Sequence, residues 1–267
     1  MNASEHFRAG QLAEAVAAAT AAVKSNPGSG ATRLILCEML SFTGDFERAD
    51  KQLDAISELE PKAIHAVSLF RQLLRAEQAR TQFYQEGRLP EFLTKPSDEL
   101  QLRLQASILI RENDLPGAVL LLDQAEELRP HLSGECNGQP FDDIRDLDDL
   151  TASFLEVLTS TGKYYWIPFE AIDSMEAAPI ESPRDLLWRQ VQMSVRGGPE
   201  GVVYLPVLYT GSTAETDNQF RLGRTTDWRG GDGAPVRGIG QRMLLAGDAE
   251  RAILEIENLQ FQSPTEA

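Results

Sequence analysis

Cysteine, histidine and long apolar runs are scarce in this chain of 267 residues. It contains two cysteines, Cys37 and Cys136, and three histidines. Two cysteines form neither a disulfide framework nor a zinc ligand set, which fits a reducing compartment. The first ten residues lack the apolar core of a secretory signal, and the alanine-rich run 15–23 is too short to span a bilayer. We therefore expect a cytoplasmic protein without a membrane segment.

Basic residues are also fewer than acidic residues. The chain carries 25 Lys and Arg against 41 Asp and Glu, a net charge of −16. Such a balance disfavours nucleic acids and anionic membranes as partners. The acids are densest at 141–150, where Asp143, Asp146, Asp148 and Asp149 could in principle hold a hard cation. We expect a helix there, which would splay the carboxylates into a solvated acidic face and leave no metal site.

Motifs for catalysis or nucleotide binding are missing too. The sequence contains no HExxH and no CxxC. TSTGKYY at 159–165 lacks the first glycine and the final hydroxyl of a P-loop, and YTGST at 209–213 has the wrong order for a nucleophile elbow. His6 and His65 read as surface residues. We therefore expect no catalytic residue and no cofactor.

What the sequence does contain is an internal repeat of 34 residues. Each copy has an anchor, a small residue five positions later and a proline seventeen positions later, as in Gly10, Ala15, Pro27; Gly44, Ala49, Pro61; and Asn113, Ala118, Pro130. Glycine or asparagine ends a first helix at positive φ, alanine lets a second helix approach closely, and proline closes the unit. This period is typical of tetratricopeptide repeats. An ordinary helical bundle with chance spacing is the alternative.

Three stretches outside these repeats also have recognisable patterns. Residues 62–96 read as a degenerate repeat, and a helix resumes near Ser97. The stretch 146–162, DLDDLTASFLEVLTSTG, reads as one more helix. After Lys163 short aromatic and branched runs alternate with Gly and Pro clusters, although RDLLWRQVQMSV also permits a helix.

The predicted fold class is therefore α+β and multidomain. We expect a helical-repeat domain at 1–135, a linker loop and helix at 136–162, and a small antiparallel β barrel or curled sheet at 163–267.

Tetratricopeptide arrays usually bind a peptide or helix on their concave face. The positions that clamp a terminal carboxylate in one version of the array correspond here to Leu34 and Glu38, and to Arg103 and Ser107. Only one of these four is basic, so we expect the groove to bind an apolar helix face or a basic segment. These four residues are predicted partner-binding positions.

The aromatic residues of the second half could line a second groove. Alternation along a strand places Tyr164 and Trp166 on one face and Tyr165 on the other, and one of the two faces should be core. In GRTTDW, Arg224 and Asp227 could form a buried or interface pair. The further partner-binding predictions are Tyr165, Trp166, Arg224, Asp227 and Trp228.

Several blocks of the second half resemble a known family. FDDIRDLDDLTASFLEVLTSTGKYYWIPFEAI, PRDLLWRQVQM, GVVYLPVLYTGS, RLGRTTDW and GIGQRMLLAGD occur in order over residues 141–246. They look like the ImpE/TagJ family, accessory proteins of bacterial type VI secretion systems. The resemblance implies a cytoplasmic, non-catalytic adaptor. It also implies two partners: a helix of the small contractile-sheath subunit, and the AAA+ ATPase that recycles the contracted sheath.

Two other functions remain open from the sequence. A hydrolase-like enzyme would have a pocket with converging polar groups near Trp166, Arg224 or Asp227. A self-associating scaffold would have no partner but itself.

Overall fold

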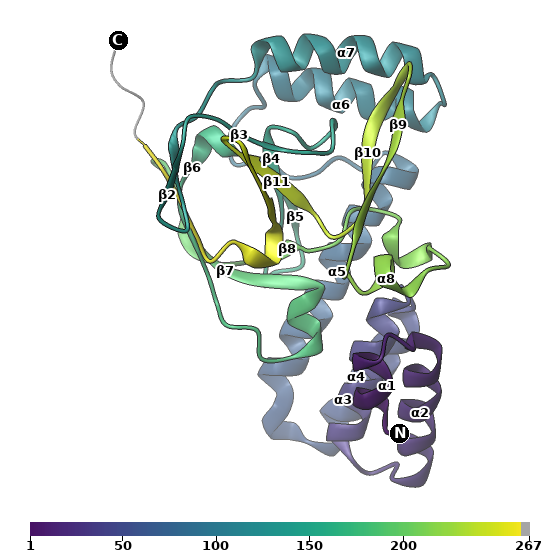
Figure 1. Ribbon diagram of the computed structural model, residues 1–267. Coiled ribbons are helices and arrows are strands. Elements are labelled where there is room, and N and C mark those ends of the chain that lie inside the picture. The colour runs from purple at the N-terminus through teal and green to yellow at the C-terminus, as the bar shows by residue number, and fades with distance from the viewer. Residues whose placement is uncertain (263–267) are drawn as a thin grey trace.

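The computed structural model describes residues 1–262, and Figure 1 shows helices above, behind and below a β-rich half. The helices of the first half are α1 (Ala3–Arg8), α2 (Leu12–Ser25), α3 (Gly30–Phe42), α4 (Phe46–Leu59), α5 (Ile64–Glu86), α6 (Asp98–Arg111) and α7 (Leu115–Leu128). None of the helices in residues 1–262 is both long and apolar enough to cross a membrane.

The predicted repeats are confirmed as helix pairs. The chain turns at Gly10 (φ +79°), Gly44 (φ +71°) and Asn113 (φ +61°), where α1 meets α2, α3 meets α4 and α6 meets α7. Positive φ is open to glycine, and asparagine tolerates it better than most residues. The alanines five positions later, such as Ala49, are fully buried where the two helices of a pair touch. The 34-residue spacing thus reflects a turn and a close approach.

The segment 62–96 departs most from the repeat. It forms the single 23-residue helix α5, which begins after a 3₁₀ turn at Pro61–Ala63 and ends at Gly87 with φ +80°. No second helix follows it before α6. In Figure 1 α5 runs behind the β-rich half and connects the α1–α4 pairs with the α6–α7 pair.

Most of the second half folds into sheets. The strands are β1 (Gly134–Cys136), β2 (Gln139–Phe141), β3 (Ile144–Asp146), β4 (Phe154–Leu158), β5 (Tyr164–Pro168), β6 (Ile172–Ala177), β7 (Trp188–Val195), β8 (Glu200–Pro206), β9 (Thr226–Gly231), β10 (Ala234–Gly240), β11 (Met243–Ala246), β12 (Ala249–Ala252) and β13 (Asn258–Phe261). A short helix α8 (Asn218–Arg221) lies between β8 and β9. RDLLWRQVQMSV becomes a 3₁₀ turn at Pro183–Leu186 followed by strand β7.

The strands form an open sheet, without a closed barrel among residues 1–262. The large sheet has the order β2-β1-β13-β6-β7-β8-β4-β5, and its end strands β2 and β5 do not pair with each other. A three-stranded sheet, β12-β11-β3, and the β9–β10 hairpin complete the half. The prediction of antiparallel sheets is therefore confirmed and that of a barrel is not, and the hairpin projects toward α7 (Figure 1).

The prediction of a helix at 146–162 is wrong. Residues 148–153 form turns, and Phe154–Leu158 is strand β4, which pairs with both β5 and β8. All five residues of β4 are buried, so the strand lacks the alternation of apolar and polar residues that marks a half-exposed strand. Strands β1 to β4 all precede Lys163, and β1 pairs with the last strand, β13. The division at 135 and 162 stays a prediction.

Candidate partner-binding site

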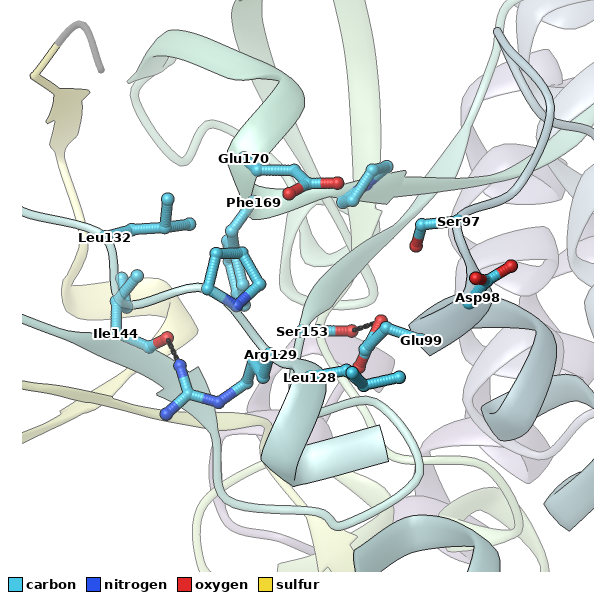
Figure 2. A pocket seen from close by; sticks show the side chains of 12 residues that line it. Ser97, Asp98, Glu99, Leu128, Arg129, Leu132, Ile144, Ser153, Phe169 and Glu170 are labelled. Carbon is cyan, nitrogen blue, oxygen red and sulfur yellow. Dashed lines mark hydrogen bonds between the residues drawn. The ribbon is translucent and has the colours of Figure 1, made fainter. Parts of the chain in front are cut away.

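A pocket of about 220 Å³ lies where α6 and α7 meet the large sheet (Figure 2). The start of α6 supplies Ser97, Asp98 and Glu99, and the end of α7 supplies Leu128 and Arg129. The sheet side is lined by Ile144, Ser153, Pro168, Phe169 and Glu170. The residues that form the pocket thus come from segments up to 73 positions apart in the sequence, from Ser97 to Glu170.

Ion pairs fix one side of this pocket. Arg129 donates to Asp143 (Nη1–Oδ1 2.8 Å) and to the carbonyl of Ile144 (3.1 Å), the second of which is drawn in Figure 2. Burial raises the pKa of Asp143, but the hydrogen bond and charge of Arg129 outweigh it and hold this pKa below its ordinary value. The end of α7 is therefore held on strand β3 by a charged pair.

The start of α6 is held just as firmly. Arg103 pairs with Glu99 and with Glu126, and also donates to the carbonyl of Asp149. Ser153 donates to the other oxygen of Glu99 at 3.0 Å (Figure 2). Because Glu99 is satisfied by two donors, it is a structural acid.

Two further carboxylates at the pocket lack such partners. Asp98 and Glu170 are both exposed, and neither has an ion-pair partner among the described residues. Burial of part of its side chain and the charge of Glu99 raise the pKa of Glu170. Close by, Leu128 is 54% exposed. The pocket therefore offers apolar walls with unpaired negative charge, a combination that suits an apolar segment carrying Lys or Arg.

Three of the four partner-binding positions predicted on the helical repeats are buried inside the protein. Arg103 and Ser107 are buried, 1% and 4% exposed, and Ser107 donates to the carbonyl of Leu104 at 2.6 Å. Glu38 is 7% exposed and faces Arg184 of the 3₁₀ turn, and burial raises its pKa to about 7. Leu34 is 41% exposed. Of the four, Leu34 alone keeps an accessible side chain.

The aromatic predictions divide between core and surface. Trp166 is fully buried, stacked on Phe154 with ring centroids 4.0 Å apart, and its indole N–H donates to the Tyr164 hydroxyl at 2.6 Å. Tyr165 points to the other face of β5 and is partly exposed. Trp228 is 38% exposed and packs edge-on against Tyr209. The alternation predicted for 164–166 is present, and it makes Trp166 a core residue.

Arg224 and Asp227 do not form the pair considered from the sequence. The Nη2 atom of Arg224 donates to the carbonyls of Phe7 (2.8 Å) and Arg8 (3.0 Å) at the end of α1. Asp227 is exposed and accepts the backbone N–H of Trp228. The hypothesis of a pair is therefore wrong, and Arg224 instead connects the second half of the chain with its first helix.

The acidic stretch 141–150 also departs from its prediction. Asp146 and Asp148 are 0% and 1% exposed rather than solvated. Asp146 pairs with Arg242 (2.5 Å) and accepts the Tyr209 hydroxyl (2.7 Å), while Asp148 pairs with Arg237 (2.8 Å). Among residues 1–262, no group of three or more acids, histidines and cysteines is arranged to hold a metal ion. These carboxylates therefore anchor their segment to strand β10 and to Arg242, which lies between β10 and β11.

The centre of this buried network, Glu156, was not predicted from the sequence. It is 1% exposed, and it accepts hydrogen bonds from Arg80 of α5 (2.9 Å), Arg242, Tyr84 of α5 (3.0 Å) and Tyr164 (2.5 Å). Burial raises its pKa, but the two guanidinium groups lower it further, to about 2. A single acid inside the apolar run FLEVL was the available signal, because such a residue is rarely buried without a partner.

Known family models match both halves of this chain. The family model described as ImpE protein matches residues 138–260, and a tetratricopeptide-repeat model matches residues 6–80. The type VI secretion system accessory component TagJ of Pseudomonas aeruginosa is 30% identical over 267 residues, which cover 100% of this chain and 93% of that protein. This chain belongs to the ImpE family.

A solved structure shares the whole fold. The crystal structure of protein VPA1032 from Vibrio parahaemolyticus superposes with a TM-score of 0.91 at 29% identity, covering 98% of this chain and 97% of that one. The arrangement of helical repeats, α5 and open sheets is therefore shared by this chain and VPA1032.

Proposed function

We propose that this protein is a non-catalytic, cytoplasmic adaptor of a type VI secretion system. It binds a helix of the small contractile-sheath subunit and links that subunit to the AAA+ ATPase that recycles the sheath. The observation that supports this proposal most is the 30% identity, over the full chain, to a type VI secretion accessory component. The helical repeats support it further, because such repeats commonly bind peptides or helices.

The pocket of Figure 2 is the proposed docking site for the helix. Its accessible apolar wall consists of Leu128, Pro130, Leu132 and Pro168, with the buried side chains of Ile144 and Phe169 beneath it, and this wall would cover the apolar face of an amphipathic helix. Asp98 and Glu170 would pair with Lys or Arg side chains at the edge of that face. Exposed pairs of this kind guide orientation and rate more than they add affinity, so the apolar walls would supply most of the binding free energy.

A hydrolase is less well supported by the arrangement of the residues named for it. Trp166 lies in the core, Arg224 is bound to α1, and Asp227 is exposed on the hairpin. The three do not converge on one pocket, which removes the specific reason for that alternative.

Crosslinking followed by co-purification from cells with an intact secretion apparatus tests the proposal. The small sheath subunit and the ATPase should be recovered with the wild-type chain. A variant carrying both Asp98→Asn and Glu170→Gln should recover less sheath subunit, whereas Glu127→Gln, exposed on α7 outside the pocket, should behave as the wild type. Recovery of neither partner with folded protein would overturn the proposal, and recovery of only a second copy of the chain would favour the scaffold.

A further inference from the structure

The outer edge of strand β9 is an open edge of a sheet. Within residues 1–262 the β9–β10 hairpin is a sheet of two strands, so β9 has a neighbouring strand on one side only. Residues 227–230 are all exposed, and Trp228 among them is 38% exposed. An exposed strand edge presents a row of backbone donors and acceptors to which another strand can pair.

The register of the hairpin shows which backbone groups of β9 point to this edge. Trp228 lies opposite Gly238 of β10, and the N–H of Gly238 donates away from β9, to Asp148 at 3.0 Å. Because hydrogen-bonded and non-hydrogen-bonded pairs alternate in an antiparallel ladder, this pair is of the second kind. The N–H and C=O of Trp228 therefore point outward. The N–H donates to the carboxylate of Asp227 at 2.8 Å, and the carbonyl accepts no hydrogen bond from the described residues.

The residues around Trp228 are complementary to their own reverse. Asp227 and Arg229 flank Trp228, so their side chains lie on one face of β9 and the indole lies on the other. If a second β9 pairs antiparallel about a two-fold axis at Trp228, each Asp227 lies opposite the second copy's Arg229. Such a pair is non-hydrogen-bonded, with Cα atoms about 4.5 Å apart and side chains on the same face. The axis thus creates two acid–base pairs on one face and places the two indoles side by side on the other.

We propose that the protein forms a weak symmetric dimer in which β9 pairs antiparallel with the β9 of a second copy. The N–H and C=O of Trp228 bond to the same groups of the second copy, and the released carboxylate of Asp227 pairs with the second copy's Arg229. In the free chain Arg229, with a side chain 62% exposed, pairs with Glu215. Pairs as exposed as this one contribute little, so exchanging it costs little. The order acid, aromatic, base favours a second copy as the occupant, because a strand with this pattern matches itself.

The dimer does not depend on the partner that occupies the pocket of Figure 2, because none of the residues that line this pocket belongs to β9. The two proposals can therefore fail separately.

Sedimentation equilibrium of the purified full chain tests whether the dimer forms. Five paired residues on each strand make a contact smaller than the usual stable interface, so we expect a Kd of about 100 μM. The weight-average mass should rise from 29.5 kDa in dilute solution toward twice that value at about 500 μM protein. A wild type that stays monomeric at this concentration would overturn the proposal.

Charge reversal tests whether the dimer forms through β9. Asp227→Arg places arginine opposite arginine, and Arg229→Asp places aspartate opposite aspartate, so each variant alone should dimerise at least tenfold more weakly. An equal mixture of the two variants restores opposite charges at both positions and should dimerise as the wild type does. Asp248→Arg, the same reversal at an exposed position outside the hairpin, is the control and should also match the wild type. Single variants that dimerise like the wild type, or a mixture that stays monomeric, would contradict the assignment.

Discussion

At the scale of single residues, the molecule depends on acids that are buried and paired. Glu156 accepts hydrogen bonds from two arginines and two tyrosines that come from α5, β5 and the segment before β11. Each of these donors would be left without its acceptor if the carboxylate were removed, and unpaired buried charges are costly. Glu156 therefore connects the long helix with the sheet.

Neutralising this acid should destabilise the whole fold. We expect Glu156→Gln to lower the free energy of unfolding by about 3 kcal/mol or more, because the charges of Arg80 and Arg242 lose a shared partner. Urea unfolding at pH 7 measures the change. Glu135→Gln, the same substitution at an exposed position of β1, is the control and should stay within about 0.5 kcal/mol of the wild type. Equal midpoints for the two variants would contradict the role given to Glu156.

The buried carboxyl group of Glu38 should make the stability of the protein depend on pH. Burial raises its pKa in the folded state from 4.5 to about 7, although the nearby Arg184 opposes the shift. Between these two values the folded protein binds more protons than the unfolded one, so Glu38 contributes a loss of stability as pH rises from about 4.5 to 7. We expect Glu38→Gln to match the wild type near pH 4 and to be more stable by about 2–3 kcal/mol at pH 8.

Urea unfolding of the two proteins between pH 4 and pH 8 measures this difference. Burial also raises the pKa of Asp146, to about 6, so Asp146 contributes a loss of stability over a lower range of pH. This contribution is the same in both proteins and cancels when their free energies of unfolding are compared. Curves for wild type and Glu38→Gln that run parallel over the whole range would show that the Glu38 carboxyl titrates normally.

At the scale of elements, the helix pairs depend on small residues at their contacts. Ala49 of α4 is 0% exposed against α3, where Cys37 donates to its carbonyl. We expect Ala49→Leu to overpack this contact and to cost about 1–3 kcal/mol, measured by thermal or urea unfolding. Ala17→Leu, at an exposed position of α2, should change stability little. A well-tolerated leucine at position 49 would mean that the pair is not closely packed.

The helix pairs were predictable because their signals are local. Positive φ at Gly10 and Gly44, and close packing at Ala49, impose residue types at fixed distances along the chain. Strand β4 gave no such signal, because it is covered on both faces and its apolar run resembles a buried helix. The acids before it suggested the first turn of a helix, whereas Asp146 and Asp148 in fact pair with arginines about 90 residues later. Ion pairs between residues so far apart in the sequence are determined by the fold, and they produce no periodic pattern in the sequence.

The candidate site was predicted only in its chemistry. The repeats, with one basic residue among the four counted positions, indicated an apolar or basic ligand. The pocket of Figure 2 is lined by apolar and acidic residues, which would suit such a ligand. Its residues could not be named in advance, because they come together from α6, α7, β3 and the end of β5. Arg103 was selected by counting within the repeat, but its charge is used by Glu99 and Glu126 inside the protein.

At the scale of the whole molecule, the second half of the chain holds the first helix in place. Arg224 donates to two carbonyls of α1, and Asn218 donates to the carbonyl of Gly10 at 2.9 Å. These bonds join positions more than 200 residues apart. They attach the first helix of the repeats to the segment that contains α8.

Removing these bonds should loosen α1 alone. We expect the double variant Arg224→Ala, Asn218→Ala to exchange amide hydrogens in residues 3–10 roughly tenfold faster, since three hydrogen bonds of modest net contribution are lost. Hydrogen–deuterium exchange with mass spectrometry measures this. Arg229→Ala, which removes an exposed pair with Glu215 on the hairpin, should leave α1 unchanged. Unchanged exchange in the double variant would show that α1 is held by its packing on α2 and α3.

The adaptor role is tested most directly by titrating the purified chain with the helix of the small sheath subunit in a calorimeter. The account predicts saturable binding with a Kd of about 1 μM or tighter, near −8 kcal/mol, and roughly tenfold weaker binding by the double variant Asp98→Asn, Glu170→Gln. Folded protein that shows no binding heat at any temperature tested would contradict the account. Full affinity in both the double variant and a Leu128→Ala variant would contradict it as well.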